Sequence, residues 1–226
     1  MIYYDKVTKI YIEGIPAVEN ITLSIDPGEF VSIVGHSGAG KTTLLKMLFA
    51  EVLPTEGSVY FGSREIKALS DRELRNLRRS IGTIFQDFRL LPMKTVYENI
   101  AFALEVAGKT DDDIAADVPH VLELVGLLDK MWNFPSQLSG GEQQRIAIAR
   151  AIVNQPDVLI ADEPTGNLDP INTHDVVQIL KKINDLGTTV LLATHNKSVV
   201  DSVGRRVVTM DQGRIVRDDK MGKYVL

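Results

Sequence analysis

The chain of 226 residues contains no cysteine, which excludes disulfides and thiolate metal sites. Long hydrophobic runs are also missing. The longest uninterrupted apolar run covers residues 100–104, far fewer than the ~18 that indicate a membrane span. The first residues lack the basic start and apolar core of a signal peptide, so we expect the chain to stay in the cytoplasm.

Positive charge is not in excess either. The 25 lysine and arginine residues face 30 acidic residues, for a net charge of -5, and this argues against a nucleic-acid partner because phosphate binding usually requires a basic domain. What the chain does contain, 44% hydrophobic and 24% charged residues without repeats or low-complexity tracts, is typical of an ordinary globular protein. We therefore expect one domain with room for a subdomain.

The first third of the sequence predicts strands around a glycine-rich loop. Apolar and polar residues alternate over residues 21–25, which predicts a half-buried strand ending at a Pro-Gly turn. A second strand, residues 30–34, leads into the loop and then into an apolar-striped helix. Further strands are expected at residues 58–61 and 82–85, and between them Ser70 and Glu73 form a capping box that starts an arginine-rich helix.

The middle third, residues 95–154, has a helical pattern. Pro119 falls inside one of these helices, and we expect that helix to begin at the proline. Continuous apolar runs return at residues 158–161 and 189–193, as in a parallel sheet covered on both faces. Residues 207–216 predict a hairpin, so the sequence indicates an α/β core with a helical insertion.

The glycine-rich loop matches the pattern G-x-x-x-x-G-K-[ST], between a predicted strand and a predicted helix. Its glycines allow backbone N–H groups to point at phosphate oxygens, and the helix N-terminus adds partial positive charge. Lys41 brings a full charge to the β- and γ-phosphates, and the Thr42 hydroxyl is placed to bind Mg²⁺. The predicted nucleotide-binding set of this loop is Gly35, His36, Ser37, Gly38, Ala39, Gly40, Lys41, Thr42 and Thr43.

Two carboxylates follow the buried strand at residues 158–161. Asp162 is predicted to hold Mg²⁺ through water, and Glu163 to polarise an attacking water. Adjacent acids after a strand are common as solvated turn residues, so this pair gains its meaning from the phosphate loop.

A second candidate anion site is the segment Leu138-Ser139-Gly140-Gly141-Glu142, which precedes Gln143-Gln144-Arg145. Its Ser139 hydroxyl and the free N–H groups of Gly140 and Gly141 stand at a predicted helix start. This segment resembles the signature sequence of the ABC (ATP-binding cassette) ATPases and, as in that family, lies upstream of the Asp162 strand.

The resemblance implies a P-loop NTPase core with a mixed sheet, an N-terminal antiparallel β-subdomain and an inserted helical subdomain. Residues 1–226 then form one ATP-binding domain, with the core at about 1–91 and 155–226 and the helical part at about 92–154. It also implies that the signature, including Glu142, completes the ATP pocket of the opposite subunit. ATP would therefore bring two copies together as a homodimer, and a C₂ arrangement serves both partners alike.

Four further positions match family motifs that are weak individually. Gln86 matches the glutamine that contacts Mg²⁺ and the attacking water, and His195 matches the histidine near the γ-phosphate. Asp169 matches the aspartate at the dimer seam, and Tyr11 matches the aromatic residue that stacks on adenine. The implied catalytic set is thus Glu163, His195, Gln86 and Lys41, the metal set is Thr42, Gln86 and Asp162, and the cofactors are ATP and Mg²⁺.

Residues 161–169 resemble the group of ABC ATPases that contains FtsE, the lipoprotein-release ATPase and the macrolide-export ATPase. Within that group, residues 126–130, 133–135 and 137–145 are most similar to the FtsE family of bacterial cell-division ATPases. That resemblance implies a peripheral subunit at the cytoplasmic face of the membrane, docked to an FtsX-like integral membrane protein and controlling cell-wall hydrolases during division. Apolar candidates for the docking groove are Phe88, Leu90, Leu91 and Tyr97, each of which a core position explains equally well.

Three alternatives stay open at this point. The chain could serve a lipoprotein-release or macrolide-export transporter, which the same residues fit. A soluble cassette acting on nucleic acid or ribosomes usually carries two cassettes or a long coiled-coil insertion, and this sequence has neither. A module that binds ATP without turnover is disfavoured by the presence of both Glu163 and His195.

Overall fold

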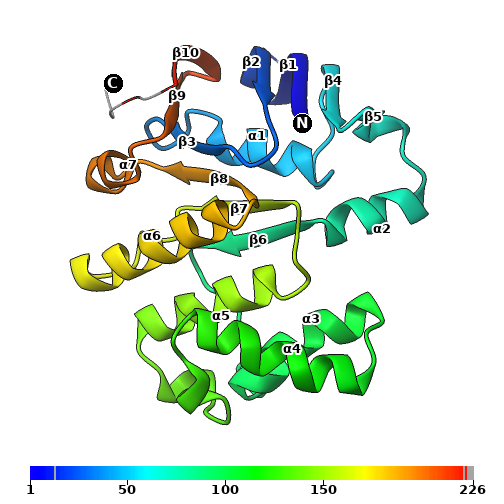
Figure 1. The fold of residues 1–226 in the computed structure, drawn as a ribbon. Helices are drawn as coiled ribbons and strands as arrows, with labels where there is room; N and C mark the ends of the chain where they lie inside the picture. Colours follow the sequence, from blue (N-terminus) through cyan, green and yellow to red (C-terminus); the bar gives the residue numbers. More distant parts are fainter. Residues whose placement is uncertain (13, 221, 223–226) are drawn as a thin grey trace.

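A computed structural model describes residues 1–12, 14–220 and 222 (Figure 1). The strands are β1 (Ile2–Ile12), β2 (Ile15–Ile25), β3 (Phe30–Val34), β4 (Glu56–Phe61), β5 (Arg64–Glu65), β6 (Ile81–Phe85), β7 (Val158–Asp162), β8 (Thr189–Thr194), β9 (Arg206–Asp211) and β10 (Arg214–Asp219). The α-helices are α1 (Lys41–Leu48), α2 (Asp71–Arg79), α3 (Val96–Ala107), α4 (Asp111–Leu124), α5 (Gly140–Ile152), α6 (Pro170–Asp185) and α7 (Lys197–Val203). Short 3₁₀ turns cover Ile66–Ala68, Leu128–Lys130 and Pro135–Gln137.

The larger sheet has the order β10-β9-β3-β8-β7-β6 and is mixed. Strands β6, β7, β8, β3 and β9 are parallel, and β10 pairs antiparallel with β9. Alternate residues of one strand enter different cores: in β8, Val190 and Leu192 pack with the helices α3 to α7, whereas Leu191 and Ala193 pack on the side of α1. Burial on both faces explains the continuous apolar runs in the sequence.

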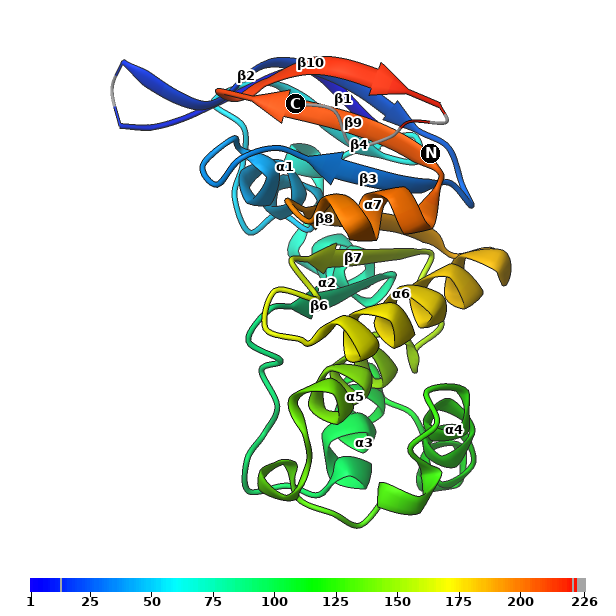
Figure 2. The ribbon, with the colours of Figure 1, turned by 90° about the vertical axis from the view of Figure 1, so that its left-hand side faces the viewer.

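The N-terminal sheet, β2-β1-β4-β5, is antiparallel throughout. It shares a core with α1 and with one face of the larger sheet (Figure 2). Tyr4 is buried there, and its hydroxyl donates to the Leu44 carbonyl oxygen of α1 at 3.1 Å. Burial raises the pKa of the Tyr4 phenol above its ordinary value, so this residue is a core anchor between the sheet and α1.

Helices α3, α4 and α5 lie together below the larger sheet in both ribbon views (Figures 1 and 2). Each begins with a capping box, at Thr95, Thr110 and Ser139, in which the N-cap hydroxyl and the third helical residue bond reciprocally. The capping box predicted at Ser70 and Glu73 is confirmed at the start of α2. The α/β core with an inserted helical part and an antiparallel β part is therefore as expected.

The expected start of a helix at Pro119 is wrong. Helix α4 begins at Asp111 and runs through Pro119 to Leu124. The start is set by the Thr110 cap and by three aspartates in the first turn, which favour the positive end of the helix dipole. Val118, Val121 and Leu122 bury an apolar face on both sides of the proline, and this packing offsets the lost backbone hydrogen bond.

The C-terminal hairpin is confirmed. Gln212 and Gly213 join β9 to β10, and both have positive φ, 43° and 78°, as a two-residue hairpin turn of the right twist requires. Among the described helices, none has the length and apolar character needed to cross a membrane.

Candidate nucleotide-binding site

The glycine-rich loop leaves the C-terminal end of β3 at the centre of the larger sheet and enters α1. Two glycines are required by close backbone approach. A Cβ on Gly35 would collide with the Met210 carbonyl oxygen of β9, and one on Gly40 would lie 2.5 Å from the Ala17 carbonyl oxygen of β2. The loop is thus clamped between the two sheets, with Gly40 at φ 98°, a left-handed conformation that favours glycine.

Lys41, the first residue of α1, has a buried side chain within this loop. Its Nζ donates to the carbonyl oxygens of Gly35 at 2.8 Å and His36 at 3.0 Å. The same Nζ lies 3.9 Å from Glu163 Oε1. The loop therefore holds a positive charge at the N-terminus of a helix, which is an arrangement suited to anionic phosphate.

Asp162, at the end of β7, carries an unsatisfied oxygen beside the same helix. Its Oδ1 is buried and has no hydrogen-bond partner among the described residues, while the Thr42 hydroxyl bonds to the carboxyl group. Burial is the main cause that raises the pKa of Asp162, and the neighbouring Glu163 adds to it. A buried carboxylate oxygen next to a hydroxyl fits a hard divalent cation such as Mg²⁺.

No group of three or more His, Cys, Asp or Glu side chains suited to a metal ion occurs in the described part of the chain. Mg²⁺ is commonly held by one or two protein groups together with substrate phosphates and water.

Glu163 is held by residues at the end of β8 and by His195, which follows β8 directly. Its Oε1 lies 2.8 Å from His195 Nδ1, its Oε2 accepts from the Thr194 hydroxyl at 3.2 Å, and its backbone N–H donates to the Ala193 carbonyl oxygen at 2.9 Å. Its φ is 48°, an unfavourable conformation for a non-glycine residue that costs of order 1–3 kcal/mol. The strain and three contacts together point the carboxylate at Lys41 instead of along the strand.

Gln86 follows β6 and lies against the loop after β7. Its side-chain amide donates to Asn167 Oδ1 at 3.2 Å, and Asn167 Nδ2 donates back to the Gln86 carbonyl oxygen at 3.3 Å. The structure thus brings Gln86 next to the segment that contains Glu163 and Asp169, although no hydrogen bond joins it to Lys41 or Asp162 within the described residues.

The residues after Gln86 are gripped by α5. Arg150 donates from Nη1 to the Arg89 carbonyl oxygen at 2.6 Å and from Nη2 to the Phe88 carbonyl oxygen at 2.9 Å. Phe88 and Arg89 have left-handed backbones, with φ of 56° and 50°. Two charge-assisted bonds to two consecutive strained residues fix the path of this loop. Burial lowers the pKa of Arg150, which stays protonated.

The Ser139 segment forms the start of α5, as predicted. The Ser139 hydroxyl and Glu142 make a capping box, while Ser139 and Gly140 are exposed. A Cβ on Gly141 would overlap the side chain of Asn172 in α6, so the two helices meet here backbone to side chain. Within the described residues, no hydrogen bond or ion pair joins this segment to the phosphate loop of the same chain.

Two predicted binding residues have other contacts. Tyr11 is exposed near the tip of the β1–β2 hairpin, with Lys9 Nζ 5.3 Å from its ring centre. Asp169 is the N-cap of α6, accepting from the backbone N–H groups of Ile171 and Asn172 at 2.9 and 3.0 Å. Those bonds, led by the one from Asn172, lower the pKa of Asp169.

Four residues of this region were not predicted from the sequence: Thr194, Asn167, Arg150 and Asn172. Thr194 precedes His195 directly and Asn167 precedes Leu168-Asp169, so adjacency to a motif was the available signal. Arg150 and Asn172 carry no such signal, because each acts across more than 30 residues of sequence or between helices.

The glycine-rich loop joins a central parallel strand to a helix, and two carboxylates stand at the end of a nearby strand. These features together define the class of P-loop nucleotide-binding proteins. Comparison with known proteins gives the same class. Residues 18–166 match the model of the ABC transporter family.

Curated relatives are similar over nearly the whole chain. It is 50% identical to the cell division ATP-binding protein FtsE of Bacillus subtilis, across 99% of this chain and 98% of that protein. Identity to the FtsE of Mycobacterium tuberculosis is 53%, with the same coverage. A solved dimeric ATP-binding cassette in a post-hydrolysis state, bound to ADP and Pi, superposes with a TM-score of 0.88 at 37% identity, covering 99% of this chain and all of that one. The chain belongs to the ABC transporter family and, within it, to the FtsE family of cell-division ATP-binding proteins.

Proposed function

We propose that this chain is a Mg²⁺-dependent ATPase subunit of a cell-division ABC complex. One observation carries the chemistry: Glu163, Lys41 and His195 form a contact cluster at the mouth of the phosphate loop. Relatives named as ATP-binding proteins and a neighbour bound to ADP and Pi support ATP as the nucleotide.

In this proposal the loop residues 35–43 wrap the phosphates with backbone N–H groups, and Lys41 neutralises negative charge on them. Thr42 and Asp162 would hold Mg²⁺, with Gln86 as a further ligand. When bound, the ion supplies charge neutralisation at the β- and γ-phosphates.

Glu163 is proposed to accept a proton from the attacking water. Thr194 and His195 hold its carboxylate in one orientation, so little reorganisation is needed when the water arrives. His195 is exposed and lies on the outer side of this carboxylate, where it can also reach the transferred phosphoryl group.

The functional unit is proposed to be a homodimer formed on ATP binding. The exposed Ser139 and Gly140 at the start of α5 offer an unused anion site far from the chain's own phosphate loop. A C₂ dimer brings the segment of one copy, residues 139–142, to the nucleotide of the other, with Asp169 at the seam and Tyr11 against the adenine. The dimeric cassette among the similar structures supports this arrangement.

A membrane partner similar to FtsX is proposed to bind beside the loop that follows Gln86, placing this chain at the cytoplasmic face of the membrane. Of the four predicted docking residues, Leu90 and Tyr97 pack against the core and all four are half-buried. Met93 and Trp132 are more exposed, at 85% and 65%, and Trp132 stacks on Tyr97 at 5.2 Å. Residues 92–154 would act as the helical subdomain that joins this surface to the Ser139 segment, and dimer closure would control cell-wall hydrolysis.

The experiment that tests the mechanism is the substitution Glu163→Gln. We expect unchanged ATP binding, hydrolysis slowed about 10²- to 10³-fold, and a dimer that accumulates because the nucleotide is retained. Phosphate release and size-exclusion chromatography with MgATP measure these effects. Rapid phosphate release by the variant, or a monomer at saturating ATP, would contradict the proposal, and no release by the wild type would indicate a binding module without turnover.

A further inference from the structure

A cavity of about 680 Å³ opens at the opposite end of the larger sheet from the phosphate loop. Strands β7 and β8 begin at it, at Val158 and Thr189, and end at Asp162 and Thr194 beside the nucleotide site. A strand of five or six residues spans roughly 17–20 Å, so the two sites are separate.

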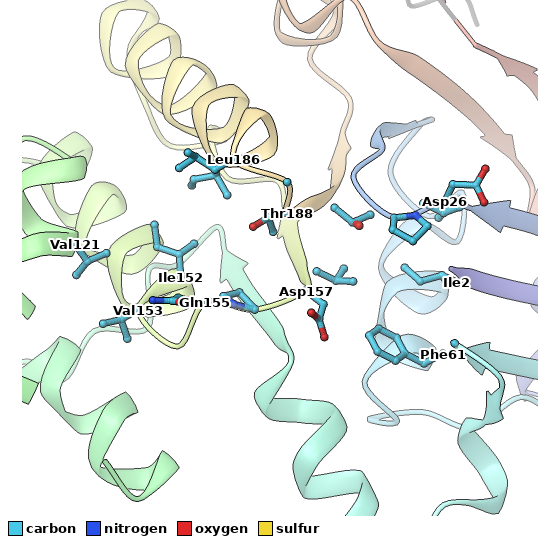
Figure 3. Close-up of a pocket in the computed structure, with 18 of the residues that line it drawn as sticks. Ile2, Asp26, Phe61, Val121, Ile152, Val153, Gln155, Asp157, Leu186 and Thr188 are labelled. Carbon is cyan, nitrogen blue, oxygen red and sulfur yellow. The ribbon is translucent and has the colours of Figure 1, made fainter. Parts of the chain in front are cut away.

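The walls of this cavity are largely apolar and come from distant parts of the sequence. Val121 of α4 and Ile152 and Val153 at the end of α5 form one side, and Ile2 of β1 and Phe61 of β4 form the other. Asp157 and Thr188 lie between these two apolar groups, and Leu186 stands near the first (Figure 3). The volume of the cavity falls within the range of small-molecule sites, and its mostly apolar lining with a few polar groups is typical of them.

The lining carries more acidic groups than basic groups. Asp26, Asp117 and Asp157 contribute three carboxylates, which outnumber the basic groups of the lining, the His120 imidazole and the Met1 amino group. Among the described residues, no lysine or arginine lines the cavity, and none of the three carboxylates has a hydrogen bond or ion pair. Because the carboxylates lack internal partners, the cavity is complementary to a cation.

Asp157 is the best-positioned of the three. The preceding Pro156 is buried, and the Asp157 carbonyl oxygen accepts from the Thr189 N–H at 3.0 Å, which ties the residue to the first bond of the β7–β8 pair. Gln155, which precedes Pro156, has a left-handed backbone with φ of 50°. The Gln155 N–H donates to the Ile152 carbonyl oxygen at 2.8 Å. The carboxylate therefore stands on a rigid turn between two apolar walls.

We propose that this cavity binds an amphipathic organic cation: an apolar body seated against the walls, and an ammonium group at Asp157. The proposal rests on cavity shape and charge and is independent of ATP hydrolysis. The ligand class is a small amine of up to drug-like size, since the cavity has a volume of about 680 Å³ and is lined by α4 on one side and β4 on the other.

Three probes of matched shape test it: 4-phenylbutylamine, the neutral 4-phenylbutan-1-ol and the anionic 4-phenylbutyrate. Binding to the full chain without nucleotide is followed by amide chemical shifts in two-dimensional NMR. We expect saturable shifts at residues 155–158 and 186–189, strongest affinity for the amine, weaker for the alcohol and weakest for the carboxylate. Equal affinities, shifts elsewhere, or no saturable shift would overturn the proposal.

Variants locate the contact. Asp157→Asn should weaken amine binding roughly fivefold and leave alcohol binding unchanged, as a partly exposed charge pair predicts. Leu186→Ser, at a side chain that is 71% exposed, should weaken all three probes without unfolding the chain. Asp112→Asn, which removes an exposed charge from α4 outside the cavity, is the control and should change nothing.

A competition experiment separates this site from the nucleotide site. The amine shifts should persist at saturating MgATP. Displacement by ATP would overturn the assignment, whereas loss of hydrolysis in Glu163→Gln leaves probe binding unaffected, so the two proposals can fail independently.

Discussion

Three residues of the candidate site have backbone conformations that are unfavourable for a residue with a side chain. Glu163, Phe88 and Arg89 all have left-handed backbones without being glycine. Each is fixed by a named partner, Thr194 and His195 for the first and Arg150 for the other two. Strain of this kind persists only where the surroundings over-determine the residue, and it concentrates at sites with a function.

The raised pKa of Asp162 leads to a prediction about how stability depends on pH. Because burial raises its pKa in the folded state, the folded chain binds more protons than the unfolded chain just above the ordinary aspartate pKa. Stability therefore falls as the pH rises through the window between the unfolded and the raised folded pKa. Asp162→Asn removes the cost of burying the charged carboxylate. We expect it to raise the Tm of the nucleotide-free chain by roughly 2–4 °C, which corresponds to about 1 kcal/mol in the free energy of unfolding for a chain of this size.

The same variant should lose the extra stabilisation that MgATP gives the wild type over ATP with a chelator. Thermal unfolding at several pH values measures both effects. An unchanged Mg²⁺ dependence in Asp162→Asn would remove this residue from the proposed metal site.

The two hydrogen bonds of Arg150 lead to a second prediction for a single residue. Arg150→Lys keeps the charge but cannot reach both carbonyl oxygens with a planar fork, so the loop after Gln86 should loosen. We expect faster hydrogen exchange at residues 86–89 and hydrolysis reduced roughly ten- to a hundredfold, since small misplacements near reacting groups are costly. Arg145→Lys on the same helix, where the pair with Asp175 is 3.6 Å long, is the control. Unchanged exchange in Arg150→Lys would show that the loop is held by other contacts.

At the scale of elements, the caps set where helices begin, and packing decides whether they continue. Helix α4 shows the conflict: its cap and acidic first turn fix the start at Asp111, and its buried face carries it past Pro119. The proline leaves the Ala115 carbonyl oxygen without its helical donor and crowds it.

Pro119→Ala should therefore stabilise the chain, by about 1–3 kcal/mol, because the missing backbone bond is restored and the crowding is relieved. Urea unfolding measures the gain. Pro170→Ala is the matched control: Pro170 is the first residue of α6, where proline is favourable, so no gain is expected. A destabilised Pro119→Ala would mean that the proline fits a bend that the packing requires.

At the scale of the whole molecule, the proposed function divides the nucleotide site between two regions of the chain that do not meet. The phosphate loop and Glu163 lie at the end of the larger sheet, and the Ser139 segment starts a helix in the separate α3–α5 region (Figure 2). Two copies arranged about a twofold axis would form two complete sites, which gives a direct test by mixing.

Ser139→Arg and Glu163→Gln should each be inactive, and an equal mixture should regain about a quarter of wild-type hydrolysis. Half of the dimers then contain both variants, and each of these has one intact site of its two. Phosphate release by the mixture measures the recovery, and each variant mixed with itself is the control. No recovery, with dimers present in the mixture, would place the complete site within one chain.

The sequence alone determined the features that depend on short stretches of backbone. The strand–loop–helix around Lys41, the capping box of Ser70 and Glu73, the apolar runs of β7 and β8 and the final hairpin are all local, because turn chemistry, capping and side-chain periodicity act within a few residues. Those local motifs, in their order along the chain, were also sufficient to predict the family.

Only the tertiary structure decided which residues far apart in the sequence contact one another. The fork of Arg150 on Phe88 and Arg89, the pairing of Gln86 with Asn167 and the continuation of α4 through Pro119 depend on packing between elements far apart in sequence. The cavity at Asp157 likewise exists because six separate segments of the chain converge there. Local preferences are worth a kcal/mol or less each, so the burial of apolar surface between elements overrides them, and a single sequence does not state which elements will meet.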